Sequence, residues 1–269
     1  MTADLIAQLA QAGLSDPADE LRAILNRLGL RADAEWSAED TERLHAVVAR
    51  RAGREPLAYI LKEQGFWSLD LAVSPHVLNP RPDTECLVET MLKRIDDKAA
   101  SLRLLDLGTG SGAIMLALLS ELPNASGIAT DQSPEALAVA EINAHQAGLA
   151  DRVRFVHTDW AAGLNGPFDL IVSNPPYIES AVIETLEPEV RDHEPRAALD
   201  GGADGLEAYR AILDTIAALC TDGTQLGFEI GFDQATSVGA LMVAAGWNTP
   251  ALTHDYGGNP RVLVSTPAG

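Results

Sequence analysis

Apolar residues recur every three or four positions near the start of the chain. After the helix-start signal Asp16-Pro17, this spacing predicts a helix whose buried face is formed by Leu21, Ile24, Leu25 and Leu28. A second start signal at Ser37 predicts another helix that ends near Gly53. Because helices this short are not stable alone, we expect residues 1–64 to pack as a small all-helical domain.

The pattern changes at Gly65. Large apolar residues then follow at Phe66, Trp67, Leu69, Leu71 and Val73, which are typical of β-strands. We therefore expect residues 65–82 to form a β-hairpin that links two domains.

Strands and helices alternate along residues 83–269. The expected strands are 102–107, 127–130, 153–157, 168–172 and 225–230. The expected helices are 83–95, 113–122, 133–148, 206–220 and 233–245. The end of the chain, 252–256 and 262–265, predicts an antiparallel hairpin. This alternation predicts an α/β fold with a parallel sheet covered by helices on both faces, and ligands bind beyond the carboxyl ends of such strands.

Length and composition are those of an ordinary globular protein. A chain of 269 residues with 46% hydrophobic residues can form two modest domains with buried cores. Its apolar runs are too short to span a bilayer, and its acidic start lacks the basic residues of a secretion signal. We expect a monomeric cytoplasmic protein with no membrane association. Cys86 and Cys220 lack metal-ligand spacing, so we expect no metal.

Charge narrows the range of partners. The chain carries 39 acidic and 19 basic residues, a net charge of −20. Such a protein repels phosphates, which disfavours sequence-independent binding to DNA or RNA. The excess of acid fits a solubility or salt adaptation of the source organism equally well.

A glycine-rich loop follows the first strand of the second domain. Its candidate cofactor-binding residues are Asp106, Gly108, Thr109, Gly110, Ser111 and Gly112. Glycines let the backbone approach a ligand closely, and the N–H groups that begin the next helix suit a carboxylate or phosphate. The spacing differs from the G-x-G-x-x-G of dinucleotide-binding proteins. The acid at the strand end can receive a cationic amino group, which favours S-adenosylmethionine over a pyrophosphate.

Two further strands of the second domain also end in acids. Asp131 is placed to accept hydrogen bonds from both ribose hydroxyls of such a ligand. Asp159 and Trp160 offer a carboxylate and an aromatic ring that could hold and cover adenine. A single acid at a strand end is commonly only a helix cap. Three on successive strands behind a glycine loop predict a cofactor site.

The fourth strand runs into Asn174-Pro175-Pro176-Tyr177. Prolines fix the backbone and remove N–H donors. The side-chain carbonyl of Asn174, the main-chain carbonyl of Pro175 and the ring of Tyr177 suit a planar NH2 group of a nucleobase or a carboxamide. Two acceptors would leave the nitrogen lone pair aimed at the methyl group, so catalysis would rest on alignment and electrostatics.

Further segments extend this pattern along nearly the whole chain. They are Arg54-Glu55-Pro56-Leu57-Ala58-Tyr59-Ile60, Arg81-Pro82-Asp83-Thr84-Glu85, and Glu189-Val190 with His193-Glu194-Pro195-Arg196, continued by Ala198-Leu199-Asp200-Gly201-Gly202 and Asp204-Gly205-Leu206. With these segments the chain resembles the release-factor glutamine N5-methyltransferases, the PrmC/HemK family. Asn79 departs from the family pattern, in which an apolar residue is common before Pro-Arg-Pro.

The resemblance implies a class I, Rossmann-like methyltransferase domain at residues 83–269 and a helical domain that helps to grip a class 1 release factor. It also implies that the glycine loop, Asp131, Trp160 and Asn174 contact S-adenosylmethionine. Residues Asn174, Pro175, Pro176 and Tyr177 would hold the glutamine of a Gly-Gly-Gln loop.

Three rival functions stay open on the sequence. A glutamine methyltransferase that acts on a ribosomal protein would use identical chemistry. An adenine-N6 DNA methyltransferase shares the Asn-Pro-Pro-Tyr motif but would need a basic target-recognition region, which a chain of net charge −20 lacks. A catalytically silent S-adenosylmethionine sensor would have no use for an amide-binding site.

Overall fold

The computed structural model describes residues 2–269 and divides into two compact units. The first unit is formed by residues 2–63 with 186–193, and the second by 64–185 with 194–269. Residue 1, the first residue of the predicted helical domain, lies outside the described residues.

The first unit is helical. Its helices are α1 (Thr2–Gln11), α2 (Pro17–Arg27), α3 (Ala38–Ala52) and α4 (Leu57–Leu61). The predicted start signals act as caps, because the side chain of Asp16 accepts a hydrogen bond from Asp19 N and Ser37 Oγ accepts one from Asp40 N. The predictions of α2 and α3 are therefore confirmed. The unit packs around fully buried side chains, among them Leu9, Ile24, Leu44 and Val48.

A distant segment of the chain belongs to this first unit. It contains the short helix α8 (Pro188–Arg191) and joins the unit through ion pairs. The guanidinium of Arg51, only 6% exposed, lies between Glu20 and Glu189, at 2.8 and 2.9 Å. Arg54 also pairs with Glu189, at 2.6 Å. A buried arginine requires acidic partners of this kind. Arg51 and Glu189 are 138 residues apart in the sequence, so no local pattern predicts their ion pair.

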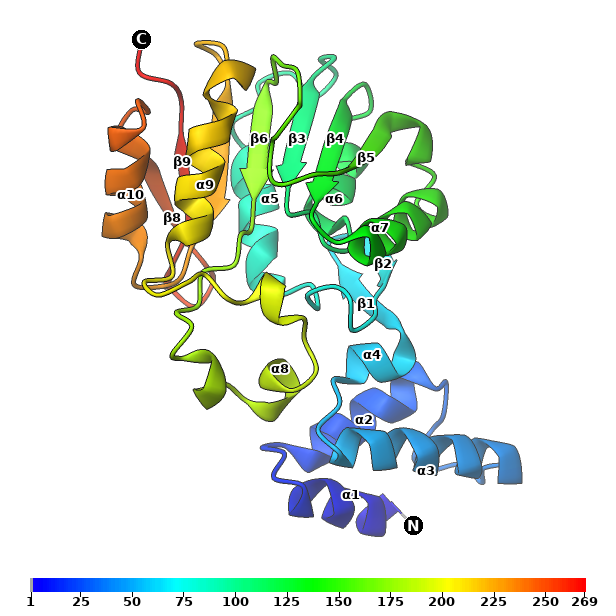
Figure 1. Ribbon diagram of the computed structural model, residues 1–269. Coiled ribbons are helices and arrows are strands. Elements are labelled where there is room, and N and C mark those ends of the chain that lie inside the picture. Colours follow the sequence, from blue (N-terminus) through cyan, green and yellow to red (C-terminus); the bar gives the residue numbers. More distant parts are fainter. Residues whose placement is uncertain (1) are drawn as a thin grey trace. The chain divides into compact units, whose positions relative to one another are not determined.

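The second unit is built on a seven-stranded sheet of order β5-β4-β3-β6-β7-β9-β8 (Figure 1). The strands are β3 (Arg103–Leu107), β4 (Ser126–Asp131), β5 (Val153–His157), β6 (Leu170–Ser173), β7 (Gln225–Glu229), β8 (Ala251–His254) and β9 (Pro260–Ser265). The first five pair in parallel, while β9 pairs antiparallel with both β7 and β8. The predicted Rossmann-like sheet with a terminal antiparallel hairpin is confirmed. A separate hairpin is formed by β1 (Glu63–Phe66) and β2 (Leu69–Ala72).

Helices cover both faces of this sheet, as predicted. One core contains residues of α5 (Glu85–Leu92), α6 (Ala113–Glu121) and α7 (Pro134–Gln146). The other contains residues of α9 (Glu207–Ile216) and α10 (Ala235–Ala244), which lie in front of the sheet in Figure 1. Because both faces are covered, β6 is buried along its whole length and reads as a continuous apolar run.

Most predicted boundaries agree with the structure to within two or three residues. A single helix was predicted over residues 206–220. In the structure the α-helix ends at Ile216 and a 3-10 turn follows it. The 3-10 turns are η1 (Pro82–Thr84), η2 (Ala150–Arg152), η3 (Ile183–Thr185), η4 (Arg196–Ala198) and η5 (Ala217–Leu219). Within residues 2–269, no helix is both long enough and apolar enough to cross a membrane.

Candidate active site

A cavity of about 260 Å³ lies at the carboxyl ends of the parallel strands of the second unit. The loops after β3, β4, β5 and β6 contribute to it, together with residues 75–81 and 195–198. Of the predicted site residues, those that line it are Gly108, Thr109, Gly110, Ser111, Asp131, Asp159, Trp160, Asn174 and Pro176. Asp106, Gly112, Pro175 and Tyr177 are not among its lining residues.

The glycine loop is shaped by backbone conformations that other residues rarely adopt. Gly108, Gly110 and Gly112 have φ angles of 72°, 55° and 82°. A Cβ on Gly108 would lie 3.3 Å from the Trp160 ring, so the absent side chain leaves room for that ring. The loop is also tied to the neighbouring strand, since Thr109 N donates to Thr130 O at 2.8 Å.

Asp131 at the end of β4 holds two loops in place. Its Oδ2 accepts a hydrogen bond from Gly110 N and its Oδ1 accepts one from Ser133 N, both at 2.9 Å. Ser133 in turn caps α7 by accepting from Ala136 N. Each carboxylate oxygen has further acceptor capacity, so Asp131 can bind a ligand hydroxyl while it holds the loops.

The third strand end supplies a carboxylate and an aromatic ring to the cavity. Asp159 and Trp160 both line it, and Trp160 has the unusual φ of 47°. The indole ring also packs against the core on the α9 side of the sheet. The ring is thus held over Gly108 as a fixed wall of the cavity.

Asp106 lies beneath the glycine loop and is fully buried. Its Oδ2 accepts a hydrogen bond from Thr109 Oγ1 at 2.6 Å, while Oδ1 is buried with no partner. Burial raises the pKa of this carboxyl to about 7, and the Thr109 hydrogen bond opposes that rise.

Asn174 follows β6 and turns its amide in a defined direction. Its Nδ2 donates to Thr84 Oγ1 at 3.2 Å, and the residue lines the cavity. The backbone of Tyr177 is fixed from the far side, because Gln234 Nε2 donates to its carbonyl at 3.0 Å. Burial raises the pKa of the Tyr177 hydroxyl to about 12, so the ring stays neutral.

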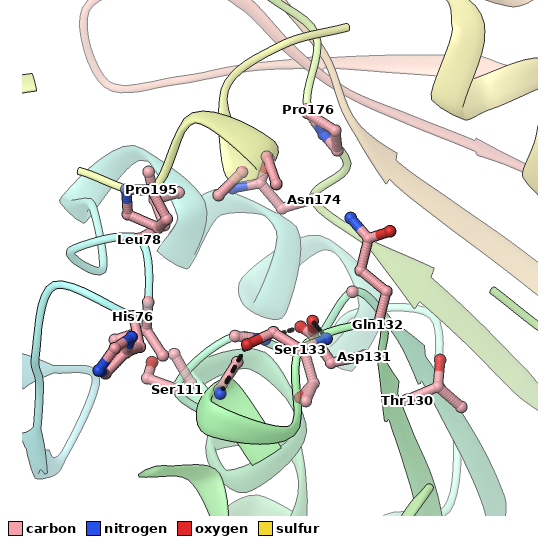
Figure 2. A pocket seen from close by; sticks show the side chains of 18 of the residues that line it. His76, Leu78, Ser111, Thr130, Asp131, Gln132, Ser133, Asn174, Pro176 and Pro195 are labelled. Atoms are coloured by element: carbon pink, nitrogen blue, oxygen red, sulfur yellow. Dashed lines mark hydrogen bonds between the residues drawn. The ribbon is translucent and has the colours of Figure 1, made fainter. Parts of the chain in front are cut away.

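Several lining residues escaped the sequence analysis. Figure 2 shows His76 and Leu78 on one side of the cavity, with Pro195 beside Leu78 and Gln132 next to Asp131. The first two belong to the predicted linker, whose Pro-rich sequence carries no binding signal. The Arg81-to-Glu194 ion pair, at 2.6 Å, joins the two segments that supply this wall. The Oδ1 atom of Asn79, the departure noted above, is buried without a hydrogen-bond partner.

Known proteins share both the domains and the order in which they occur. Residues 82–188 match the family model of the methyltransferase small domain, and residues 2–61 match that of the PrmC N-terminal domain. The release factor glutamine methyltransferase of Agrobacterium fabrum is 42% identical over 98% of this chain and 96% of its own length. That of Caulobacter vibrioides is 44% identical over 96% and 92%.

The chain belongs to the release factor glutamine methyltransferases.

Solved structures agree with the fold of this methyltransferase. A methyltransferase from Pyrococcus furiosus superimposes with a TM-score of 0.56 at 17% identity, covering 87% of this chain and all of that chain. At this identity the likeness concerns the fold alone. The resemblance noted in the sequence is therefore confirmed by relatives that cover nearly the whole methyltransferase.

Proposed function

We propose that the enzyme transfers a methyl group from S-adenosylmethionine to the side-chain nitrogen of the glutamine in the Gly-Gly-Gln motif of a class 1 release factor. The orientation of Asn174 is the observation that carries this proposal. Asn174 lines the cavity, and because its Nδ2 donates to Thr84, the carbonyl oxygen Oδ1 is the part of its amide that can accept from a ligand. An acceptor there suits a ligand that brings an N–H donor, as a carboxamide does.

The residues of the cavity fit S-adenosylmethionine. The missing side chain of Gly108 leaves space under the Trp160 ring that a Cβ would fill. The Asp131 carboxylate can still accept hydrogen bonds from ribose hydroxyls. Asp159 lines the cavity as Trp160 does, and its carboxylate can accept from adenine. Asp106 has Oδ1 unpartnered beneath the loop, and the cationic amino group of the cofactor would favour the ionised form of this carboxyl. When bound, the cofactor supplies a methyl group carried on a sulfonium.

The acceptor side of the cavity aligns the substrate nitrogen. Asn174 Oδ1 and the main-chain carbonyl of Pro175 would accept its two hydrogens and leave the lone pair aimed at the methyl carbon. The bound cofactor would supply the methyl group, while these two acceptors would hold the receiving nitrogen in place. One proton then leaves the nitrogen for water. Alignment at ~3–3.5 Å and two fixed acceptors supply the catalysis, so no strong base is required.

The wider setting follows from the same proposal. A release factor is the protein partner, and the net charge of −20 disfavours a nucleic-acid substrate. We expect the enzyme to work in the cytoplasm as a monomer and to need no metal. Light scattering on the purified enzyme measures its oligomeric state. Activity after treatment with a chelator shows whether a metal is required.

Labelled methyl transfer tests the function directly. The enzyme is incubated with methyl-labelled S-adenosylmethionine and an unmethylated release factor, beside a copy whose Gly-Gly-Gln glutamine is replaced. We expect label on the first protein and none on the second. Label on both would place the target elsewhere in the release factor. Label on neither, with ribosomal protein labelled in a parallel reaction, would favour the alternative substrate.

A further inference from the structure

A buried carboxyl lies beside Asn174 without a role in the function proposed above. Glu229 ends β7 and is 2% exposed. Strands β6 and β7 pair in parallel with Ser173 opposite Phe228, so the next residue of each strand, Asn174 and Glu229, lie side by side. One carboxyl oxygen, Oε2, is buried with no hydrogen-bond partner. An isolated buried acid is costly, so its presence calls for a physical reason.

Glu229 and Thr84 together decide which way the Asn174 amide faces. Asn174 Nδ2 donates to Thr84 Oγ1 at 3.2 Å, and both side chains lie near the Glu229 carboxyl and lower its pKa. Since Thr84 Oγ1 accepts from the amide, its own proton is free to go to Glu229. A flipped amide would give up the Nδ2 bond to Thr84 and turn Oδ1 toward the Glu229 carboxylate, which can only accept. The pair thereby keeps Oδ1 turned toward the substrate.

Charged and titratable groups from every neighbouring element surround Glu229. These are Asp83 of η1, Cys86 of α5, Tyr177 after β6, Tyr209 of α9 and Arg261 of β9. Burial raises the pKa of Glu229 to about 7, the Thr84 hydrogen bond and Arg261 oppose the rise, and Asp83 adds to it. The carboxyl therefore ionises close to neutral pH, and the ionised form is the stronger acceptor for both donors.

We propose that Glu229, acting with Thr84, is a positioning residue for methyl transfer that holds the Asn174 carbonyl toward the substrate amide. The inference rests on the proposed function, because Asn174 matters only if it binds an amide. It gives a role to Thr84 of the Arg-Pro-Asp-Thr-Glu segment, 90 residues away from Asn174 in the sequence.

Variants at the two positions test this inference. Glu229→Gln keeps the shape but offers no charge, and we expect kcat to fall about 10- to 100-fold while KM for the release factor and Kd for S-adenosylmethionine stay within about threefold. Thr84→Val, which removes the hydroxyl, should lower kcat similarly, and Thr84→Ser, which retains it, should restore most of the activity. Glu141→Gln, an exposed change on α7, is the control.

The pH profile distinguishes positioning from mere structural support. In the wild type, kcat should rise as Glu229 ionises near pH 7, because the charged carboxylate holds the amide better. In Glu229→Gln this rise should disappear, while thermal unfolding shows that the variant is folded. Wild-type kcat and an unchanged pH profile in Glu229→Gln would overturn the inference, as would full activity of Thr84→Val. If Glu229→Gln does not fold, the activities of Thr84→Val and Thr84→Ser still test the inference.

A measurement without substrate separates this inference from the proposed function. The side-chain NH2 signals of Asn174, assigned through their loss in Asn174→Asp, should shift with pH around 7 in the wild type and not in Glu229→Gln. This shift would support the positioning role even if no release factor were methylated. Signals insensitive to both pH and the substitution would overturn it.

Discussion

The two halves of the active site are built in different ways, although each contains a fully buried acid whose pKa lies at about 7. In the cofactor half, Asp131 organises the backbone of the loops after β3 and β4. In the acceptor half, the side chains of Thr84, Asn174 and Glu229 come together from three separate segments, and Asn174 donates to Thr84. Any sequence that forms the turn can offer backbone N–H groups to a ligand. An arrangement of side chains, by contrast, is lost when any one of its residues is replaced.

This difference explains what substitutions should do. Changes in the cofactor half should affect binding and leave the alignment of the acceptor intact. Changes in the acceptor half should affect turnover and leave cofactor affinity intact, because an acceptor that loses its geometry no longer aligns the nitrogen. Four further substitutions test this distinction, and they are given in order of decreasing expected effect.

Asn174→Ala should have the largest effect. It removes one of only two amide acceptors, so we expect methyl transfer to fall about 1,000-fold or more, with Kd for S-adenosylmethionine largely unchanged. Single-turnover transfer and calorimetry measure the two quantities. Asn165→Ala, an exposed change in the same unit, is the control. Near-normal turnover would rule out the alignment mechanism.

Asp131→Ala should act mainly on binding. It removes the proposed ribose acceptor and the anchor of Gly110 N and Ser133 N, so we expect Kd for S-adenosylmethionine to rise about 10- to 100-fold. Calorimetry measures this affinity, and Glu141→Ala on the exposed face of α7 is the control. Unchanged affinity would place the ribose contact elsewhere.

Gly108→Ala tests the backbone character of the cofactor half. The residue has φ +72° and its new Cβ would lie 3.3 Å from Trp160, so loop and ring must both shift. We expect cofactor affinity to fall about tenfold, with kcat at saturating cofactor nearly retained. Gly223→Ala, whose Cβ meets nothing closer than 3.9 Å, is the matched control. A larger loss in kcat than in affinity would contradict a binding role.

Asp106→Asn should have the smallest effect, on the pH dependence of stability. Because burial raises its pKa in the folded state from about 4 to about 7, the folded protein holds a proton that the unfolded chain has released. The free energy of unfolding should therefore fall as pH rises from about 4 to about 7. The substitution should flatten this slope only partly, since Glu229 contributes in the same direction. Urea denaturation at several pH values measures the free energy of unfolding. The same pH slope in Asp106→Asn and in the wild type would contradict the raised pKa of Asp106.

Much of the fold followed from local patterns. The starts of α2 and α3 were marked by Asp16 and Ser37, whose side chains do cap those helices. The buried strand β6 was visible as an apolar run, although it begins at Leu170 and not at Phe168. By contrast, the place of residues 186–193 in the first unit depends on ion pairs with Arg51 and Arg54, which no local pattern reveals.

The amino-acid sequence already indicated which residues lie at or just after the strand ends, and a parallel α/β fold brings those ends together. Gly108, Asp131, Trp160 and Asn174 all line one cavity. How these ends are completed depends on contacts made in the folded protein. The tertiary structure placed Asp106 beneath the loop, brought His76 and Leu78 of the linker to the cavity wall, and set Thr84 and Glu229 against the amide of Asn174. The physical reason is that hydrogen bonds between distant side chains depend on packing in three dimensions, whereas helix caps and apolar periodicity are written within a few residues.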